Sequence, residues 1–212
     1  ILAARPAMGK TSFALNIAQN VALKANVPVA IFSLEMSKEQ LVQRLLCSEA
    51  EVDAQRVKTG DLTSKDWEKI AVAMNNYAEA PVYIDDTAGC TLTDIRAKCR
   101  RLAMVEKDLG LIVIDYLQLI DSSGKYQGAR QQEISEISRK LKTMALDLGV
   151  PVIALSQLSR GVEKREDKKP VLSDLRESGA IEQDADIVAA LHAPDVEIPV
   201  TDDNIPAPIQ LI

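Results

Sequence analysis

The sequence has few aromatic residues, few cysteines and a single histidine. Aromatic residues make up 3% of the 212 residues, so a surface that stacks nucleic-acid bases would be sparse. One histidine and three cysteines, without C-x-x-C spacing, do not form a zinc motif and favour reduced thiols in a cytoplasmic protein. No apolar run approaches the length of a membrane span, and there is no signal peptide, so we expect no membrane partner.

The sequence also lacks an excess of positive charge. The formal net charge is −6, which argues against a protein that coats nucleic acid through its overall charge. A locally basic channel remains compatible with this balance. The hydrophobic content of 47% is ordinary for a globular protein, and 212 residues suffice for one domain with a substantial core.

Apolar runs that read as strands alternate with segments of helical periodicity. The expected strands are 1–3, 29–34, 82–84, 111–114, 150–155 and 187–191. Strands that alternate with helices predict an α/β fold with a mainly parallel sheet flanked by helices. Residues 158–173 are charged and of mixed sign, so we expect a mobile loop there.

Several helix boundaries and buried faces can be predicted from local patterns. Ser37 with Gln40 forms a capping-box pattern, and Thr91 with Asp94 begins another helix. Gly149 is expected to end a helix whose apolar stripe faces the core. The apolar residues of a further helix have helical spacing, which favours core positions over a ligand pocket: Trp67, Ile70, Ala71 and Met74.

Residues 4–11 resemble the phosphate-binding P-loop, because they follow an apolar strand and open a helix. Lys10 would bind the β- and γ-phosphates, and Thr11 would supply a hydroxyl to Mg²⁺. Ala4 stands where the strict motif has glycine, which the turn tolerates if φ stays negative. The residues expected to bind ATP are Ala4, Arg5, Pro6, Ala7, Met8, Gly9, Lys10, Thr11 and Ser12.

Three further polar residues follow predicted strands, and ligands of parallel sheets bind at the carboxyl ends of strands. Asp115 after four aliphatic residues fits a Walker B carboxylate that holds Mg²⁺, although such a residue can also merely cap a strand. Glu35 is a candidate catalytic base for the attacking water, or else an exposed strand-end residue. Gln157 could sense a γ-phosphate. Asp85 and Asp86 remain ambiguous, and we do not assign them to the site.

Taken together, five segments resemble the motor domain of the bacterial replicative DNA helicase of the DnaB type. They are residues 4–11, 32–37, 114–119, 156–160 and 173–186, and the last is the most specific. The resemblance covers residues 1–188 and implies a RecA-like P-loop ATPase domain. It implies a homo-hexamer that encircles single-stranded DNA and moves 5′ to 3′, with a primase and a helicase loader as partners.

By matching position, the resemblance makes Lys10, Glu35 and Gln157 catalytic and makes Thr11 and Asp115 the Mg²⁺ residues. The family's DNA-contacting loop maps onto Arg176, Glu177 and Gly179. Such contacts follow the phosphate backbone without reading sequence.

The chain also departs from the family pattern. Residues 189–212 read as a divergent tail without lysine or arginine, so an arginine finger that acts on a neighbouring subunit is not expected from it. The family's N-terminal primase-binding domain has no counterpart in this sequence. Two alternatives therefore stay open: a recombinase or clock-type ATPase, and a truncated or degenerate nucleotide-binding module without helicase turnover.

Overall fold

A single sheet runs through the middle of the protein. The computed structural model describes residues 1–121, 129–165, 167–175, 179–193 and 210–211. The strand order is β3-β2-β4-β5-β1-β6-β7, in which the first six strands are parallel and β7 is antiparallel to β6. The strands are β1 Leu2–Ala4, β2 Val29–Ser33, β3 Val82–Asp85, β4 Leu111–Asp115, β5 Val152–Gln157, β6 Ala189–His192 and β7 Gln210–Leu211. The predicted α/β fold with a mainly parallel sheet is confirmed.

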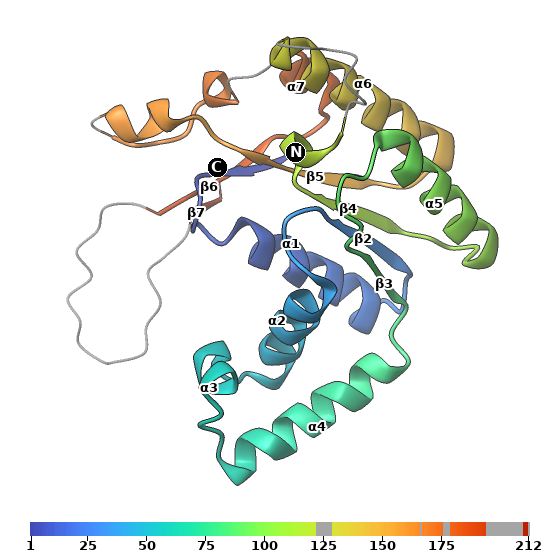
Figure 1. Ribbon diagram of the computed structural model, residues 1–212, viewed down its shortest axis with the longest axis vertical. Helices are drawn as coiled ribbons and strands as arrows, with labels where there is room; N and C mark the ends of the chain where they lie inside the picture. Colours follow the sequence, from blue (N-terminus) through green and yellow to red (C-terminus); the bar gives the residue numbers. More distant parts are fainter. Residues whose placement is uncertain (122–128, 166, 176–178, 194–209, 212) are drawn as a thin grey trace.

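Helices cover both faces of the sheet (Figure 1). The α-helices are α1 Lys10–Gln19, α2 Lys38–Ala50, α3 Ala54–Thr59, α4 Ser64–Ala78, α5 Leu92–Val105, α6 Arg130–Leu148 and α7 Gly179–Asp184. Shorter helical turns are η1 Asn20–Lys24, η2 Leu117–Leu119, η3 Arg160–Lys164 and η4 Leu172–Asp174. Helices α1 to α4 lie on one side and α5 to α7 on the other. None of the helices among the described residues is long and apolar enough to cross a membrane.

Alternate residues of each central strand point to opposite faces of the sheet and belong to two separate hydrophobic cores. In β4, Leu111 and Val113 pack with α1 and α2, whereas Ile112 and Ile114 pack with α5 and α6. All of these side chains are buried. A parallel strand covered on both faces has no solvent-facing side, which explains the uninterrupted aliphatic run in the sequence.

The expected helix boundaries follow from local hydrogen bonds. Ser37 and Gln40 form a reciprocal capping box at the start of α2, and Thr91 and Asp94 form one at the start of α5. Gly149 ends α6 in the left-handed conformation, with φ of 64°. These three predictions are confirmed, because each depends on groups within one turn of the helix end.

Two sequence interpretations were wrong. Trp67 and Met74 of α4 are 61% and 57% exposed, so these two positions do not face the core, whereas Ile70 of the same helix packs against a small apolar cluster. Residues 158–173 are not merely a polar loop: they contain η3, in which Val162 is buried. Arg165 in this segment pairs with the buried carboxylate of Asp174. Periodicity identifies an apolar face but does not reveal whether a partner covers it.

Candidate nucleotide-binding site

A pocket of about 530 Å³ lies at the carboxyl ends of the central strands. Of residues 4–12, only Met8 does not line it, and Glu35 and Gln157 line it as well. The loop after β1, the turn after β2 and the ends of β4 and β5 meet here, because β1, β5, β4 and β2 are consecutive neighbours in the sheet. The site residues predicted from these strand ends are therefore brought together.

The loop between β1 and α1 has the backbone shape of an anion cradle. Ala7 and Gly9 both have positive φ, of 64° and 75°, whereas Ala4 ends β1 without a positive φ. No side chain caps the first turn of α1, and no acidic residue lies in it. The free N–H groups of a helix start, with the positive end of the helix dipole, favour a bound phosphate.

The Lys10 side chain points into this pocket and is mostly buried. Its Nζ lies 3.7 Å from Asp115 Oδ1 and 4.4 Å from the centre of the Tyr116 ring. Burial lowers the pKa of Lys10, and the nearby carboxylates of Asp115 and Glu35 partly offset that effect. A desolvated ammonium group with so few partners is well suited to bind a phosphate.

Asp115 and Thr11 form the candidate metal-binding pair. Thr11 Oγ1 donates a hydrogen bond to Asp115 Oδ2 at 2.6 Å, and Asp115 is 3% exposed. Asp115 Oδ1 is buried and accepts no hydrogen bond from any described residue. A carboxylate oxygen without a hydrogen bond, beside a hydroxyl, fits Mg²⁺, which prefers oxygen ligands and takes few of them from protein.

Glu35 lies in the turn between β2 and α2, and two contacts fix that turn. Leu34 N donates to Asp115 O at 2.8 Å, which ties the end of β2 to the end of β4. Ser33 Oγ donates to Met36 O at 2.7 Å, which closes the turn around Glu35. The Glu35 side chain is exposed at the pocket and close enough to Lys10 to influence its pKa.

Gln157 is the last residue of β5, and its exposed side chain lines the same pocket. Arg5 approaches the same strand end, because its Nη1 donates to Leu158 O at 2.8 Å. The Arg5 guanidinium also pairs with Glu163. Arg5 therefore links the P-loop to the segment that follows Gln157.

The two aspartates left unassigned have structural partners. Asp85 pairs with Lys98 at 2.6 Å, and Asp86 accepts a hydrogen bond from Lys38 N at the start of α2. Of the predicted DNA-binding residues, Arg176 and Glu177 lie outside the described residues. Gly179 is the first residue of α7.

Sequence reasoning missed four pocket residues. Met36 lies in the turn after β2, Gln40 and Arg44 lie one turn apart on α2, and Tyr116 follows Asp115. Their spacing of four residues places Gln40 and Arg44 on one helix face, but only the packing of α2 shows that this face lines the pocket.

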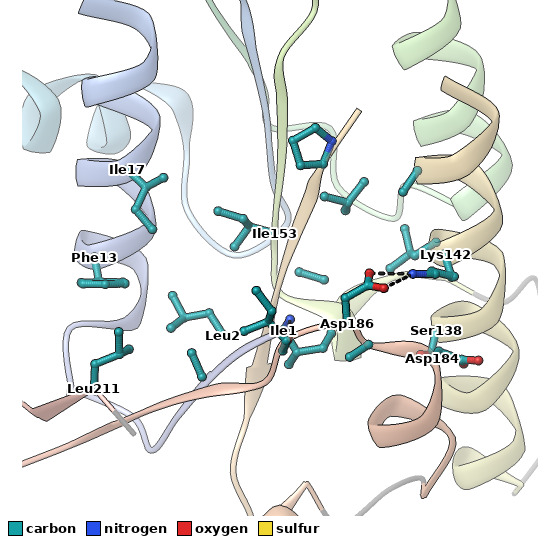
Figure 2. Close-up of a pocket in the computed structure, with 18 residues that line it drawn as sticks. Ile1, Leu2, Phe13, Ile17, Ser138, Lys142, Ile153, Asp184, Asp186 and Leu211 are labelled. Atoms are coloured by element: carbon teal, nitrogen blue, oxygen red, sulfur yellow. Dashed lines mark hydrogen bonds and ion pairs between the residues drawn. The ribbon is translucent and has the colours of Figure 1, made fainter. Parts of the chain in front are cut away.

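A second pocket, of about 510 Å³, lies at the opposite edge of the sheet, where β1, β5 and β6 begin (Figure 2). Ile153 from β5 and Phe13 and Ile17 from α1 make much of its wall apolar. Its charged groups include Lys142 and Asp186, which pair with each other at 2.5 Å. None of the predicted catalytic or ATP-binding residues lines it, whereas most of them line the pocket at the carboxyl ends.

Comparison with known proteins identifies relatives along the whole chain. A family model described as the DnaB-like helicase C terminal domain matches residues 1–209. A replicative DNA helicase DnaB from Geobacillus stearothermophilus is 63% identical over 195 residues, which is 92% of this chain and 43% of that protein. The chain thus spans less than half the length of the curated relatives it matches.

Solved structures agree with this relationship. One of them, described as an ATPase domain, superposes with a TM-score of 0.87 at 39% identity, over 100% of this chain and 78% of that one. A DnaB-like replicative helicase, whose structure is described with its interactions with primase, gives a TM-score of 0.86 at 38% identity. That comparison covers 100% of this chain and 53% of the other.

Proposed function

This chain belongs to the DnaB-like helicase C-terminal domain family, and from this premise we propose that it is the ATP-driven motor of a replicative DNA helicase. One observation carries the proposal. The P-loop, Glu35, Asp115 and Gln157 converge at one edge of the sheet, with the mostly buried Lys10 beside Asp115. The presence of a candidate base and a candidate γ-phosphate sensor beside the P-loop supports ATP hydrolysis over a module that only binds nucleotide.

In the proposed reaction, this chain's residues position ATP and activate water. The N–H groups of residues 9–12 and the Lys10 ammonium bind the β- and γ-phosphates. The ion pair of Lys10 with Asp115 is then replaced by an ion pair with phosphate oxygen. Glu35 accepts a proton from the attacking water, and Gln157 donates a hydrogen bond to the γ-phosphate. Thr11 and Asp115 would hold Mg²⁺, which when bound neutralises charge on the phosphates.

The proposed DNA contact uses Arg176, Glu177 and Gly179. An arginine and backbone N–H groups that contact phosphates would hold single-stranded DNA without reading its sequence. Helix α7 begins at Gly179 and α6 packs against it, so a change near Gln157 can be transmitted to this segment through the core. Coupled to hydrolysis, the contact would drive 5′ to 3′ movement and duplex unwinding at the replication fork.

The proposed partners follow from the family. We expect a homo-hexamer, because six such contacts around a ring can grip DNA despite a subunit net charge of −6. Primase and a helicase loader are proposed partners of the assembled helicase. The RecA-like domain in this proposal comprises residues 1–188, and the family match to residue 209 supports extending it through β6.

ATP turnover with and without single-stranded DNA, at protein concentrations that favour assembly, tests the proposal. We expect turnover that DNA stimulates, and a loss of about 100-fold or more in Lys10→Ala, because the ammonium group on the transferred phosphate is removed. Lys24→Ala, an exposed lysine in η1, is the matched control and should leave turnover unchanged.

Two results would contradict the proposal. Full turnover in Lys10→Ala would show that another site hydrolyses ATP. Turnover that single-stranded DNA leaves unchanged would indicate an ATPase without a motor function.

A further inference from the structure

The pairing of β4 with β5 stops before β5 ends. Their register runs from Ile112 opposite Val152 to Ile114 opposite Ala154. Strand β5 continues to Gln157, and its last residues pair with β1 on the other side, where Ala4 lies opposite Gln157. The β4-facing edge of residues 156 and 157 therefore has no neighbouring strand among the described residues.

The side chain of Gln118 lies in this gap. Its Nε2 donates to Ser156 Oγ at 3.0 Å, and its Oε1 accepts from Gln157 N at 3.4 Å. The next N–H group, of Leu158, points the other way and donates to Ala4 O. The Gln118 amide thus supplies one donor and one acceptor to β5 where strand β4 no longer does.

The turn that carries Gln118 is itself firmly held. Leu117 and Ile120 on either side are 0% and 2% exposed, and they anchor the turn in the core. Arg130 at the start of α6 donates to Gln118 O and also pairs with Glu133, which is buried. Because its backbone is held in this way, the Gln118 side-chain amide can position the groups to which it is hydrogen-bonded.

From this geometry we propose that Gln118 is a positioning residue for Gln157. Gln118 fixes the end of β5 on the β4 side, and Arg5 fixes Leu158 on the P-loop side. The proposal rests on the proposed function, in which Gln157 contacts the γ-phosphate. Gln118 does not line the nucleotide pocket, so it acts through the strand end.

This role predicts a specific defect. The P-loop contacts the β-phosphate, which ATP and ADP share, as well as the γ-phosphate, whereas the proposed contact of Gln157 is with the γ-phosphate alone. Loss of the Gln118 amide should therefore weaken ATP binding and spare ADP binding. A general structural defect would weaken both equally.

The experiment compares the affinities of the whole chain for ADP and for a non-hydrolysable ATP analogue, both with Mg²⁺. The variants are Gln118→Met, which keeps the length and apolar body of the side chain, Ser156→Ala, and the double variant. Gln55→Met, an exposed glutamine in α3, is the control for an added methionine. Thermal unfolding establishes that each variant is folded.

We expect Gln118→Met to bind the ATP analogue about threefold to tenfold more weakly, the range for loss of one or two hydrogen bonds, with ADP affinity within about twofold. Ser156→Ala should show a smaller loss of the same kind, since it keeps the bond to Gln157 N. The double variant should be no worse than Gln118→Met, because the two residues share one contact.

Several outcomes would overturn the proposal. An unchanged ratio of ATP to ADP affinity in folded Gln118→Met, or an equal loss for both nucleotides, would show that Gln118 does not position Gln157. Additive losses in the double variant would show that Gln118 and Ser156 act separately. If the wild-type chain binds neither nucleotide, the proposed function fails first, and that result is distinct from all of these.

Discussion

At the scale of single residues, the candidate site is organised around Asp115. Its buried carboxylate accepts a hydrogen bond from the Thr11 hydroxyl and lies near the Lys10 ammonium. The backbone oxygen of Asp115 fixes the turn that carries Glu35. A charge buried in this way needs partners, and here the partners are the proposed phosphate-binding and metal-binding groups. The carboxylate therefore orders the site before nucleotide binds.

The Glu35 carboxylate is exposed, and it has no ion pair among the described residues. It is therefore accessible to a water molecule in the pocket. For Glu35→Gln we expect ATP affinity within about threefold of the wild type and hydrolysis at least about 100-fold slower, because the amide cannot accept the proton. The measurements are ATP binding and single-turnover hydrolysis.

Glu39→Gln is the matched control for Glu35→Gln. Glu39 is an exposed glutamate four residues further along, in the first turn of α2, and its substitution removes the same charge. Loss of ATP binding in Glu35→Gln would instead assign Glu35 a structural role.

At the scale of elements, α2, α4 and α5 each begin with a side-chain cap. Thr63 and Thr91 are the N-cap residues of α4 and α5. The N–H and hydroxyl groups of each threonine donate hydrogen bonds to the carboxylate of an aspartate three residues further along. The Thr91 hydroxyl and N–H hold the pKa of Asp94 below its ordinary value of 3.8. The caps on α4 and α5 therefore depend on an ionised aspartate.

For Thr91→Ala we expect a loss of about 1 kcal/mol in the free energy of unfolding at pH 7, because α5 loses its cap. Asp94 has a lowered pKa in the folded state, so its contribution is complete above pH 3.8 and disappears as the pH falls through the folded pKa. The difference between wild type and variant should therefore narrow below about pH 4.

Urea denaturation at several pH values measures this difference. Thr93→Ala, at an exposed position in the first turn of the same helix, is the control and should not be destabilised. A difference between wild type and Thr91→Ala that stays constant down to about pH 2 would disconnect the cap from the charge of Asp94.

At the scale of the whole molecule, the segment after Gln157 links distant parts of the chain. Ser159 N donates to Asp174 O, and the Asp174 carboxylate, which is buried, pairs with Arg165. These contacts connect the proposed γ-phosphate sensor to the residues just before the proposed DNA contact. Burial of Asp174 makes its pairing with Arg165 a strong constraint on this segment.

We expect Arg165→Met to loosen residues 158–175, because Asp174 would keep a buried charge without its arginine. Limited digestion with a protease that does not require basic residues should cut this segment about tenfold faster than in the wild type. Lys164→Met, at an exposed neighbouring position, should be cut at the wild-type rate. Equal rates in the two variants would mean that Arg165 does not hold the segment.

Much of the fold and the site could be predicted because it depends on local chemistry. The P-loop, the capping boxes and the aliphatic strands all lie within short stretches of chain, and polar residues at strand ends mark the binding edge. The exposure of two apolar residues of α4 could not be predicted, since Trp67 and Met74 look the same in sequence whether or not a partner covers them. Gln118 could not be predicted either, because its partner Ser156 is 38 residues away.

The sequence by itself therefore determined the element types, the candidate phosphate-binding loop and the side chains proposed for catalysis, since each is encoded by neighbouring residues. Only the tertiary structure decided which strand ends are neighbours. The chain enters the sheet at β1, but β4 and β5 separate β1 from β2, and this order brings Thr11 to Asp115 and Gln118 to the end of β5. Strand order depends on long-range packing of two cores against both faces of the sheet, and no local pattern specifies it.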